Sequence, residues 1–269
     1  MMEYLLSILL GIVQGITEWL PISSTGHLIL VEQLWSMNDP KFFEVFKVVI
    51  QFGSILAVCV LYYKKLNPWY PTKSITERKE TWQIWMKVIV GSLPLVLGMI
   101  LDNLVEEKLS TPVVIAIALI VYGIFFILLE NKKRHPKITR IEALDYKTAL
   151  GIGCFQILAV IPGTSRSGST ILGASLLGCS RTVASEFSFF LAIPAMVGAS
   201  GLKLVKFIVK NGMFSFNELG LLIVGTVVAF VVSVFAIRFL LSYIRKHDFK
   251  IFGYYRIVLG IIVLLVFFL

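Results

Sequence analysis

The sequence has little charge. Charged residues make up 15% of its 269 positions, whereas an ordinary soluble domain carries about 25%. Hydrophobic residues make up 57% of the chain, which is more apolar surface than a soluble fold of this size could bury. We therefore expect an integral membrane protein.

Cysteine and histidine are scarce, with three of each. The cysteines are Cys59, Cys154 and Cys179. Their spacing is not that of a metal site, which argues against both a disulfide framework and a zinc site. Because His135 and His247 lie in basic segments, we expect them to be solvated. His27 is then the single imidazole left for catalysis.

A basic leader is also missing at the start of the sequence. Residues 1–16 have no positively charged n-region and continue directly into a polar motif. A cleavable signal would have the opposite character. The first apolar segment is therefore expected to be retained.

Six apolar windows approach or exceed the length of about 20 residues that crosses the hydrocarbon core. They are residues 45–63, 84–101, 112–129, 187–202, 219–241 and 257–269. We read them as six crossings of one membrane.

The net charge of +9 does not indicate nucleic-acid binding, because the basic residues lie in short segments between apolar windows. Segments 64–81, 131–147 and 242–256 are rich in Lys and Arg, and the positive-inside rule assigns them to the cytoplasm. Segment 102–110 has three acids against one lysine and is expected outside. Segment 203–217 is assigned outside by counting crossings.

Two regions do not fit simple crossings, residues 1–40 and 148–180. Each consists of apolar halves around a polar centre that contains Pro and Gly, at 21–26 and 162–168. Irregular backbone at membrane depth is tolerated only where protein or a water-filled cavity satisfies it. We predict two re-entrant helical hairpins whose tips meet inside the protein.

The two halves of the chain form a repeat. Gln14 corresponds to Gln156, and Val-Gly-Ser around Gly91 corresponds to Val-Gly-Thr around Gly225, at offsets of 134 to 142 residues. Each half contains one hairpin and three crossings, an odd number, so the second half must be inverted relative to the first.

The predicted fold is a single all-α membrane domain, residues 1–269, with six transmembrane helices and two re-entrant hairpins. It divides into repeats 1–130 and 148–269, which the basic cytoplasmic loop 131–147 joins.

A narrow polar stripe runs along the first segment. Ser7, Gly11, Gln14 and Glu18 follow helical spacings of four, three and four, which places them on one face. An ionisable residue in a membrane segment costs at least a few kcal/mol unless it is paired, roughly 2.5 or more on insertion scales. Glu18 is therefore either a functional group or a structural acid bonded to a neighbouring helix.

Hydroxyl groups gather where both hairpins break. The first break leads into Ser24 and His27, and the second contains Arg166. A helix start binds anions, and a guanidinium suits bidentate phosphate binding. Ordinary helix capping would explain one such cluster, but two related clusters predict the binding of one polyanion. The predicted diphosphate-binding residues are Gln14, Ser23, Thr25, Gly163, Thr164, Ser165, Ser167 and Thr170.

These side chains supply the groups that phosphoryl transfer needs. Ser24 is a candidate nucleophile, and His27 and Glu18 are candidate acid–base groups. Arg166 would stabilise the developing charge. A carboxylate beside phosphate also predicts a divalent cation, Mg²⁺ or Ca²⁺, held by Glu18 together with Gln14. The sequence leaves the nucleophile open between Ser24, His27 and water.

Residues 14–27 (QGITEWLPISSTGH) and 162–170 (PGTSRSGST) resemble the bacterial undecaprenyl-diphosphatase family, also called bacitracin resistance proteins, and the whole chain fits that family. In its acid motif Glu or Gln comes first and Glu fourth after it, which Gln14 and Glu18 match. Ser24, His27 and Arg166 match further functional positions of the family.

The resemblance implies hydrolysis of undecaprenyl diphosphate to the monophosphate and inorganic phosphate, which recycles the lipid carrier of cell-wall synthesis and confers bacitracin resistance. It also implies a bacterial inner-membrane protein whose active site faces the extracytoplasmic side. A polyprenyl diphosphate lipid would be the substrate, and the family allows a homodimer.

A transporter or flippase of a phosphorylated polyprenyl lipid is the main alternative, since inverted repeats with broken helices are typical of alternating access. The repeats are, however, chemically unequal. The second hairpin has Ala159 or Val160 where the first has Glu18, and only the second has Arg166. Reacting groups divided between the halves favour one chemical site. Acid-phosphatase-like lipid phosphatases need a second histidine followed by an acid together with an upstream Lys and Arg-Pro, and this combination is missing from the sequence.

Overall fold

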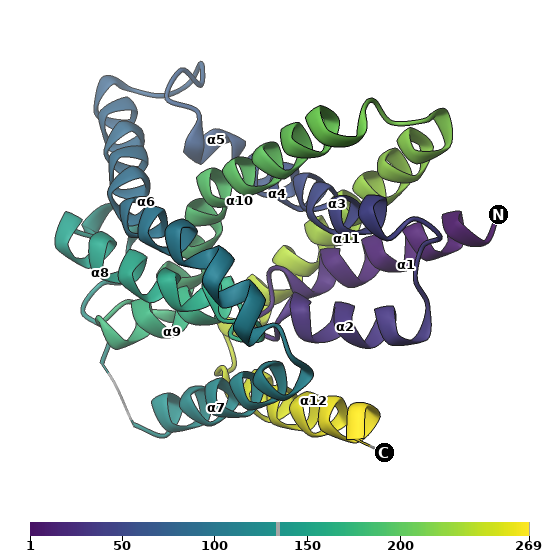
Figure 1. The fold of residues 1–269 in the computed structure, drawn as a ribbon. Helices are drawn as coiled ribbons and strands as arrows, with labels where there is room; N and C mark the ends of the chain where they lie inside the picture. The colour runs from purple at the N-terminus through teal and green to yellow at the C-terminus, as the bar shows by residue number, and fades with distance from the viewer. Residues whose placement is uncertain (133–134, 269) are drawn as a thin grey trace.

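The chain is almost entirely helical. Its structure, a computed structural model, describes residues 1–132 and 135–268, with the backbone alone for residues 99–108. Every regular element in those residues is a helix (Figure 1), as the sequence predicted. The α-helices are α1 (Met2–Thr17), α2 (Ser24–Leu34), α3 (Pro40–Val49), α4 (Gln51–Leu61), α5 (Tyr63–Leu66), α6 (Ile75–Leu109), α7 (Pro112–Asn131), α8 (Tyr146–Ile157), α9 (Arg166–Leu176), α10 (Arg181–Asn211), α11 (Phe216–Ile244) and α12 (Lys250–Phe268).

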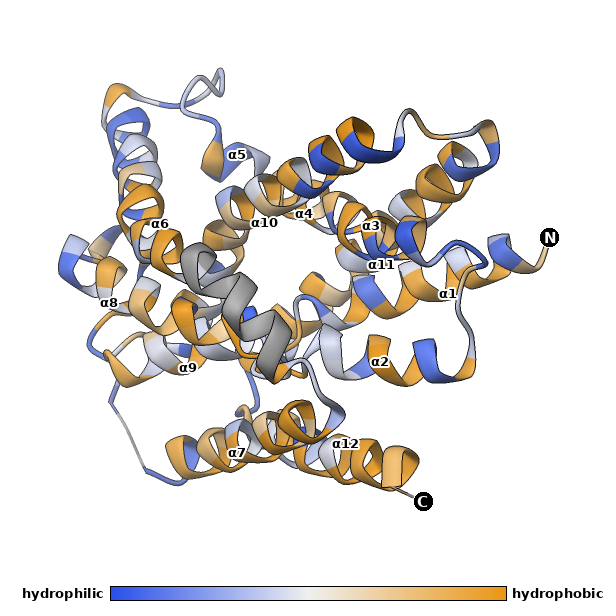
Figure 2. Ribbon diagram, viewed as in Figure 1, coloured by the Kyte–Doolittle hydropathy of each residue, from blue (hydrophilic) through white to orange (hydrophobic). Residues whose placement is uncertain are grey.

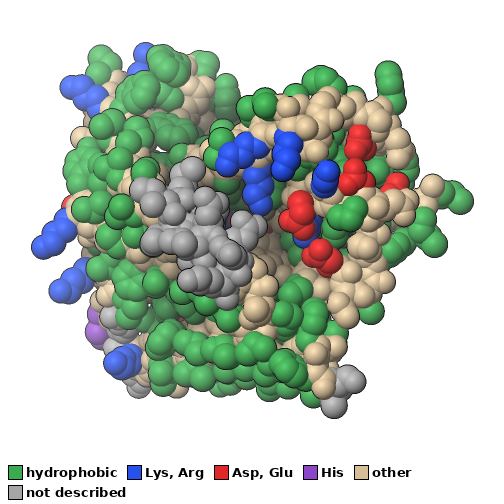
Figure 3. All heavy atoms as spheres, in the orientation of Figure 1, with side chains coloured by type: hydrophobic (Ala, Val, Ile, Leu, Met, Phe, Trp, Pro, Cys, Tyr) green, Lys and Arg blue, Asp and Glu red, His purple; other side chains and the backbone are tan. Residues whose placement is uncertain are grey.

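Six segments within the described residues are long and apolar enough to cross a membrane. They are Pro40–Leu61, Ile75–Gly98, Pro112–Asn131, Arg181–Asn211, Phe216–Ile244 and Lys250–Phe268. Apolar residues colour most of the length of α7 and α12 (Figure 2), and hydrophobic side chains cover the face that these helices present (Figure 3). The six predicted crossings are confirmed, and the chain is a multi-pass membrane protein.

Helix α11 shows why its surface suits lipid. Its exposed face carries large apolar side chains at every fourth position, Ile223, Val227, Val231, Phe235 and Phe239. Residues four apart lie on one side of a helix, so these five form a continuous apolar stripe. A stripe of this kind on a protein in water would be an aggregation hazard, whereas hydrocarbon solvates it.

Two pairs of shorter helices fit the predicted hairpins. Helix α1 packs against α2, and α8 packs against α9. In α1 the predicted polar stripe faces inward, since Ser7, Gly11, Gln14 and Glu18 are all buried. Each pair consists of helices shorter than the membrane-crossing ones, as a re-entrant hairpin requires.

Each hairpin packs closely on a helix from the other half of the chain. Helix α1 packs on α11, and α8 packs on α6. A Cβ added at Gly11 would lie 2.7 Å from the carbonyl oxygen of Gly225, and one at Gly153 would lie 2.1 Å from that of Gly91. Only glycine permits both approaches. Gly91 and Gly225 are the residues that the sequence repeat pairs.

The expected loop 102–110 is wrong, because α6 continues to Leu109. The side chains of residues 102–108 lie outside the described part of the chain, as do Lys133 and Arg134 of the basic loop 131–147. The expected loop 203–217 is also too long. Helix α10 continues to Asn211, so Lys203, Lys206 and Lys210 lie on a helix.

The expected turn 242–256 is wrong at its second end. Helix α12 begins at Lys250, and Arg256, which we had assigned to the turn, is fully buried inside that helix. The apolar window that starts at 257 marks where the charge ends and not where the helix begins.

Candidate active site

Both loops at the hairpin tips have the same backbone shape. Ser23 and Ser165 cap α2 and α9, with φ angles of 74° and 72°. Their hydroxyls accept hydrogen bonds from the amides of Gly26 at 3.3 Å and Gly168 at 3.1 Å. A left-handed conformation costs a residue other than glycine about 1–2 kcal/mol, and such strain concentrates at functional sites. Ser23 and Ser165 are therefore equivalent caps of two equivalent helix starts.

The Glu18 carboxylate joins the two hairpins. Its Oε1 accepts a hydrogen bond from Arg166 Nη2 at 3.1 Å. Its Oε2 accepts one from Gln14 Nε2 at 2.9 Å and one from Ser24 Oγ at 3.5 Å. The side chains of Glu18 and Arg166 are only 8% and 12% exposed. Ser24 and Arg166, which we predicted to lie close together, thus contact the same carboxylate.

Arg166 is oriented by contacts beyond this pair. Its Nη1 donates to the carbonyl oxygen of Ser188 at 2.8 Å, and the Ser188 hydroxyl lies 2.6 Å from that of Thr170. The guanidinium stands 5.7 Å from the centre of the Trp19 ring. These contacts therefore fix the orientation of the planar guanidinium.

Three polar atoms of this cluster are buried without a hydrogen-bond partner among the described residues, Arg166 Nε, Trp19 Nε1 and Gln14 Oε1. Buried polar atoms in native proteins usually bind protein, water or ligand. The two nitrogens are donors and the oxygen is an acceptor, so the cluster has groups for an anion and for a cation.

His27 lies one turn along α2 from Ser24, and it contacts other groups. Its Nδ1 is 2.7 Å from the carbonyl oxygen of Ser23, and its Nε2 is 2.7 Å from the Tyr255 hydroxyl. A carbonyl only accepts, so Nδ1 carries the proton; in the neutral ring Nε2 then accepts from Tyr255. Tyr255 also stacks on the imidazole at 5.6 Å. His27 is thus oriented by the Ser23 carbonyl and by Tyr255 of α12, and not by Glu18.

Most of the other predicted binding hydroxyls are engaged with the protein itself. Thr164 Oγ1 lies 2.8 Å from the carbonyl oxygens of both Leu158 and Ile161. Thr170 Oγ1 donates to the Arg166 carbonyl oxygen at 2.8 Å, and Ser167 Oγ to that of Leu20 at 3.4 Å. These contacts shape the second loop.

Two further predicted residues differ in character. Gly163 adopts a φ of +92°, and a Cβ there would lie 2.6 Å from the Ile115 carbonyl oxygen, so its role in the loop is steric. Thr25 is exposed and can meet a ligand without rearrangement.

The sequence did not indicate three residues that complete this region, Ser188, Tyr255 and Arg256. Ser188 lies inside an apolar helix with nothing in its pattern to mark it. Arg256 did carry a signal, an arginine at the edge of an apolar window, but we assigned it to a cytoplasmic turn.

The predicted cation has a partial set of ligands. Among the described residues no group of three or more His, Cys, Asp or Glu side chains could hold a metal ion. Glu18 and the unpartnered Gln14 Oε1 are oxygen ligands of the kind that Mg²⁺ and Ca²⁺ prefer. Since Mg²⁺ is commonly bound by one or two protein ligands and substrate phosphates, these residues fit a cation shared with substrate.

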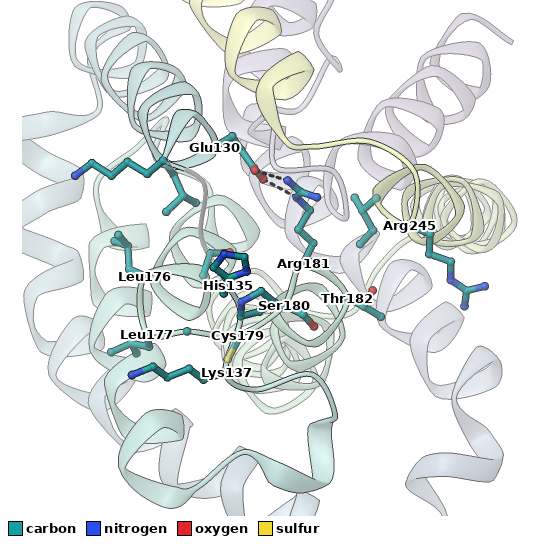
Figure 4. A pocket seen from close by; sticks show the side chains of 16 residues that line it. Glu130, His135, Lys137, Leu176, Leu177, Cys179, Ser180, Arg181, Thr182 and Arg245 are labelled. Atoms are coloured by element: carbon teal, nitrogen blue, oxygen red, sulfur yellow. Dashed lines mark hydrogen bonds and ion pairs between the residues drawn. The ribbon is translucent and has the colours of Figure 1, made fainter.

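A cavity of about 800 Å³ lies elsewhere, between the ends of α7, α9 and α10. Figure 4 shows Arg181 paired with Glu130 at its wall, with Cys179 and Lys137 nearby. Burial raises the pKa of the Cys179 thiol to about 11, so this thiol is not a nucleophile at neutral pH. The cavity contains none of the predicted catalytic residues.

The sequence matches one family model over residues 7–262, described as Bacitracin resistance protein BacA. The chain belongs to this family. The resemblance read from the two motifs is thereby confirmed, and the residues joined by Glu18 all lie within the BacA match.

Relatives of similar length carry one name, undecaprenyl-diphosphatase. The chain is 55% identical to the protein of Limosilactobacillus fermentum, over 98% of this chain and 97% of that one. It is 55% identical to the protein of Acetivibrio thermocellus (99% and 98%) and 52% identical to that of Streptococcus suis (98% and 96%).

Proposed function

We propose that this chain hydrolyses undecaprenyl diphosphate, with water, to undecaprenyl phosphate and inorganic phosphate. The observation that carries the proposal is the Glu18 carboxylate, which contacts Ser24 of one hairpin and Arg166 of the other. A reacting group and a charge-stabilising group thus lie at one place inside a membrane protein. The shared name of the relatives supports the same substrate.

Arg166 binds the phosphoryl group that is transferred. Its planar fork suits phosphate oxygens, and preorganised donors at the developing charge are worth about 10²–10³ in rate. Without substrate the fork rests on Glu18. Once a diphosphate occupies the loops, Arg166 Nε and its Nη groups can bind the phosphate oxygens, which leaves Glu18 to act as a base or a cation ligand.

Ser24, His27 or a water molecule attacks phosphorus. The bond that breaks is the P–O bond of the anhydride, and the leaving group is undecaprenyl phosphate. If Ser24 attacks, Glu18 Oε2 is placed to accept its proton, and water must then hydrolyse the phosphoserine to release inorganic phosphate and regenerate Ser24. If water attacks, either Glu18 or His27 can activate it.

A divalent cation held by Glu18 and Gln14 would neutralise charge on the diphosphate. It is part of the proposal because Glu18 is a carboxylate and the neighbouring Gln14 has a buried amide oxygen without a hydrogen-bond partner in the described part of the chain.

The location of the active site is a further part of the proposal. The positive-inside assignment makes segments 64–81 and 131–147 cytoplasmic, and the first hairpin then opens to the extracytoplasmic side of the bacterial inner membrane. Bacitracin resistance and a homodimer are proposed on family membership alone.

The test is phosphate release from undecaprenyl diphosphate by purified protein in detergent, with and without a chelator. We expect release that Ser24→Ala or His27→Ala reduces by about a hundredfold or more. Glu18→Gln should reduce activity in a way that added Mg²⁺ or Ca²⁺ only partly restores. A flat baseline under both conditions would favour the transporter alternative, which the two equivalent loops also suit.

A further inference from the structure

Arg256 on α12 contacts the tips of both hairpins. The side chain is fully buried. Its Nη1 donates to the Pro21 carbonyl oxygen at 3.2 Å, and its Nη2 donates to those of Gly163 at 2.8 Å and Thr164 at 3.0 Å. Its Nε donates to the Leu119 carbonyl oxygen on α7 at 3.4 Å. One guanidinium therefore connects both tips to the pair of helices behind them.

The carbonyls that Arg256 holds are equivalent in the two loops. Pro21 precedes the Ser23 cap by two residues, and Gly163 precedes the Ser165 cap by two. Three residues after each carbonyl come Ser24 and Arg166, the side chains that meet at Glu18. The separation of the two Nη atoms thus sets how far apart these two segments lie.

The charge of Arg256 is not matched by a carboxylate in the parts of the chain that the structure describes. In those residues the guanidinium contacts four carbonyl oxygens and the Tyr122 ring, 5.3 Å away. Leaving a guanidinium buried without a counter-ion is expensive, and an apolar helix contact would be cheaper. A purely packing role does not explain an arginine here.

We propose that Arg256 is a positioning residue, which holds the two hairpin tips in register so that Arg166 meets the groups of the first hairpin. This inference rests on the proposed function. Lysine cannot replace it, because an ammonium is a point donor that lacks the fixed fork and cannot hold carbonyls of both loops in the same geometry. A misplacement of about 1 Å can cost about a hundredfold in rate.

The experiment compares kcat, KM and the thermal unfolding midpoint for wild type, Arg256→Lys, Arg166→Lys and the double variant. We expect Arg256→Lys to lower kcat about tenfold or more while most of the protein stays folded. If Arg256 acts through Arg166, the double variant will have about the kcat of the slower single variant. The two changes in midpoint should instead add, because stability does not depend on that alignment.

Arg238→Lys is the matched control, since Arg238 is an exposed arginine on α11, and its kcat should equal that of wild type. Should Arg256→Lys fail to fold, Gly168→Ala replaces it. A Cβ at Gly168 would lie 3.0 Å from Arg256 Nη1, so it displaces the guanidinium without removing it. We expect kcat to fall again, and Gly168→Ala combined with Arg166→Lys should have about the kcat of the slower single variant.

Wild-type kcat in Arg256→Lys, or losses that multiply in the double variant, would overturn the positioning role. Failure of the proposed function gives a different result. In that case wild type itself releases no phosphate from undecaprenyl diphosphate, and the positioning role falls with the reaction that it serves.

Discussion

Glu18 occupies a position where a carboxylate is costly, and its neighbours explain how the fold keeps it there. Gln14 and Arg166 donate to its two oxygens, so the charge is paired within the membrane domain. Removing one partner of a buried pair leaves the other uncompensated, which typically costs about 3–5 kcal/mol. The pair therefore has to be probed with substitutions that preserve charge or shape.

Arg166→Lys is the first such substitution. It keeps the charge and removes the planar fork, so we expect kcat to fall by about a hundredfold while the thermal midpoint changes little. Steady-state phosphate release measures kcat, and binding of the lipid diphosphate should persist. Arg181→Lys is the control, because Arg181 forms a forked pair with Glu130 away from the site. Equal activity of the two variants would assign Arg166 a merely electrostatic role.

Tyr255→Phe tests the orientation of His27. The stacked ring remains, but the hydroxyl that lies 2.7 Å from Nε2 is lost. We expect kcat to fall roughly tenfold, less than the about hundredfold loss for His27→Ala, because the imidazole is still present but less well oriented. The neighbouring exposed Tyr254 supplies the control, Tyr254→Phe. If Tyr255→Phe matched wild type, the hydrogen bond would have no part in turnover.

At the scale of elements, the sequence predicted the helix centres well and their ends poorly. Apolar windows mark the hydrocarbon core, but a helix continues as long as its amides are satisfied. Helix α10 therefore carries Lys203, Lys206 and Lys210 beyond its window. The capping box of Ser215 with Glu218, which starts α11, is the local signal that a reading of hydropathy alone passes over.

The site shows the same division between local and long-range information. Glu18, Ser24 and Arg166 could be predicted because each stands in a broken apolar segment, where a polar or charged side chain is costly and therefore marks a functional site. Ser188 and Arg256 could not, since Ser188 contacts residues 18 and 22 positions away and Arg256 contacts residues 92 or more positions away. No local pattern encodes such distances.

Gly153 offers a test of the contact between α8 and α6. An alanine there would place its Cβ 2.1 Å from the Gly91 carbonyl oxygen, so the helices must separate. We expect the free energy of unfolding to fall by about 1–3 kcal/mol, measured by thermal unfolding in detergent. Gly198→Ala is matched, since nothing lies within 4 Å of its Cβ, and it should be neutral or stabilising. Equal midpoints for the two variants would refute the close approach.

At the scale of the whole molecule, several contacts join corresponding elements of the two halves of the chain. Helices α7 and α12 pack on each other. A Cβ on Gly123 would lie 2.6 Å from the Gly253 carbonyl oxygen, and one on Gly253 would lie 2.7 Å from that of Gly123. This reciprocal contact, the matched pairs α1–α11 and α8–α6, and the equivalent caps Ser23 and Ser165 support the inverted repeat that we propose.

An inverted repeat requires the two hairpins to enter from opposite faces of the membrane, which cysteine labelling can measure. Single cysteines are placed at Met2, at the start of α1, and at Lys147, at the start of α8, in a chain whose three native cysteines are replaced. Met213→Cys and Trp69→Cys, both at exposed positions, serve as references for the two sides. Phosphate release by each variant confirms that it is folded.

We expect a membrane-impermeant maleimide to label positions 2 and 213 in intact cells, and positions 147 and 69 only after the membrane is opened. The reason is that segments 64–81 and 131–147 hold clusters of Lys and Arg, which orient neighbouring spans toward the cytoplasm. Labelling of positions 2 and 147 from the same side would contradict the inverted arrangement. Labelling of position 213 from the cytoplasm alone would reverse the orientation and move the mouth of the active site to the cytoplasmic side.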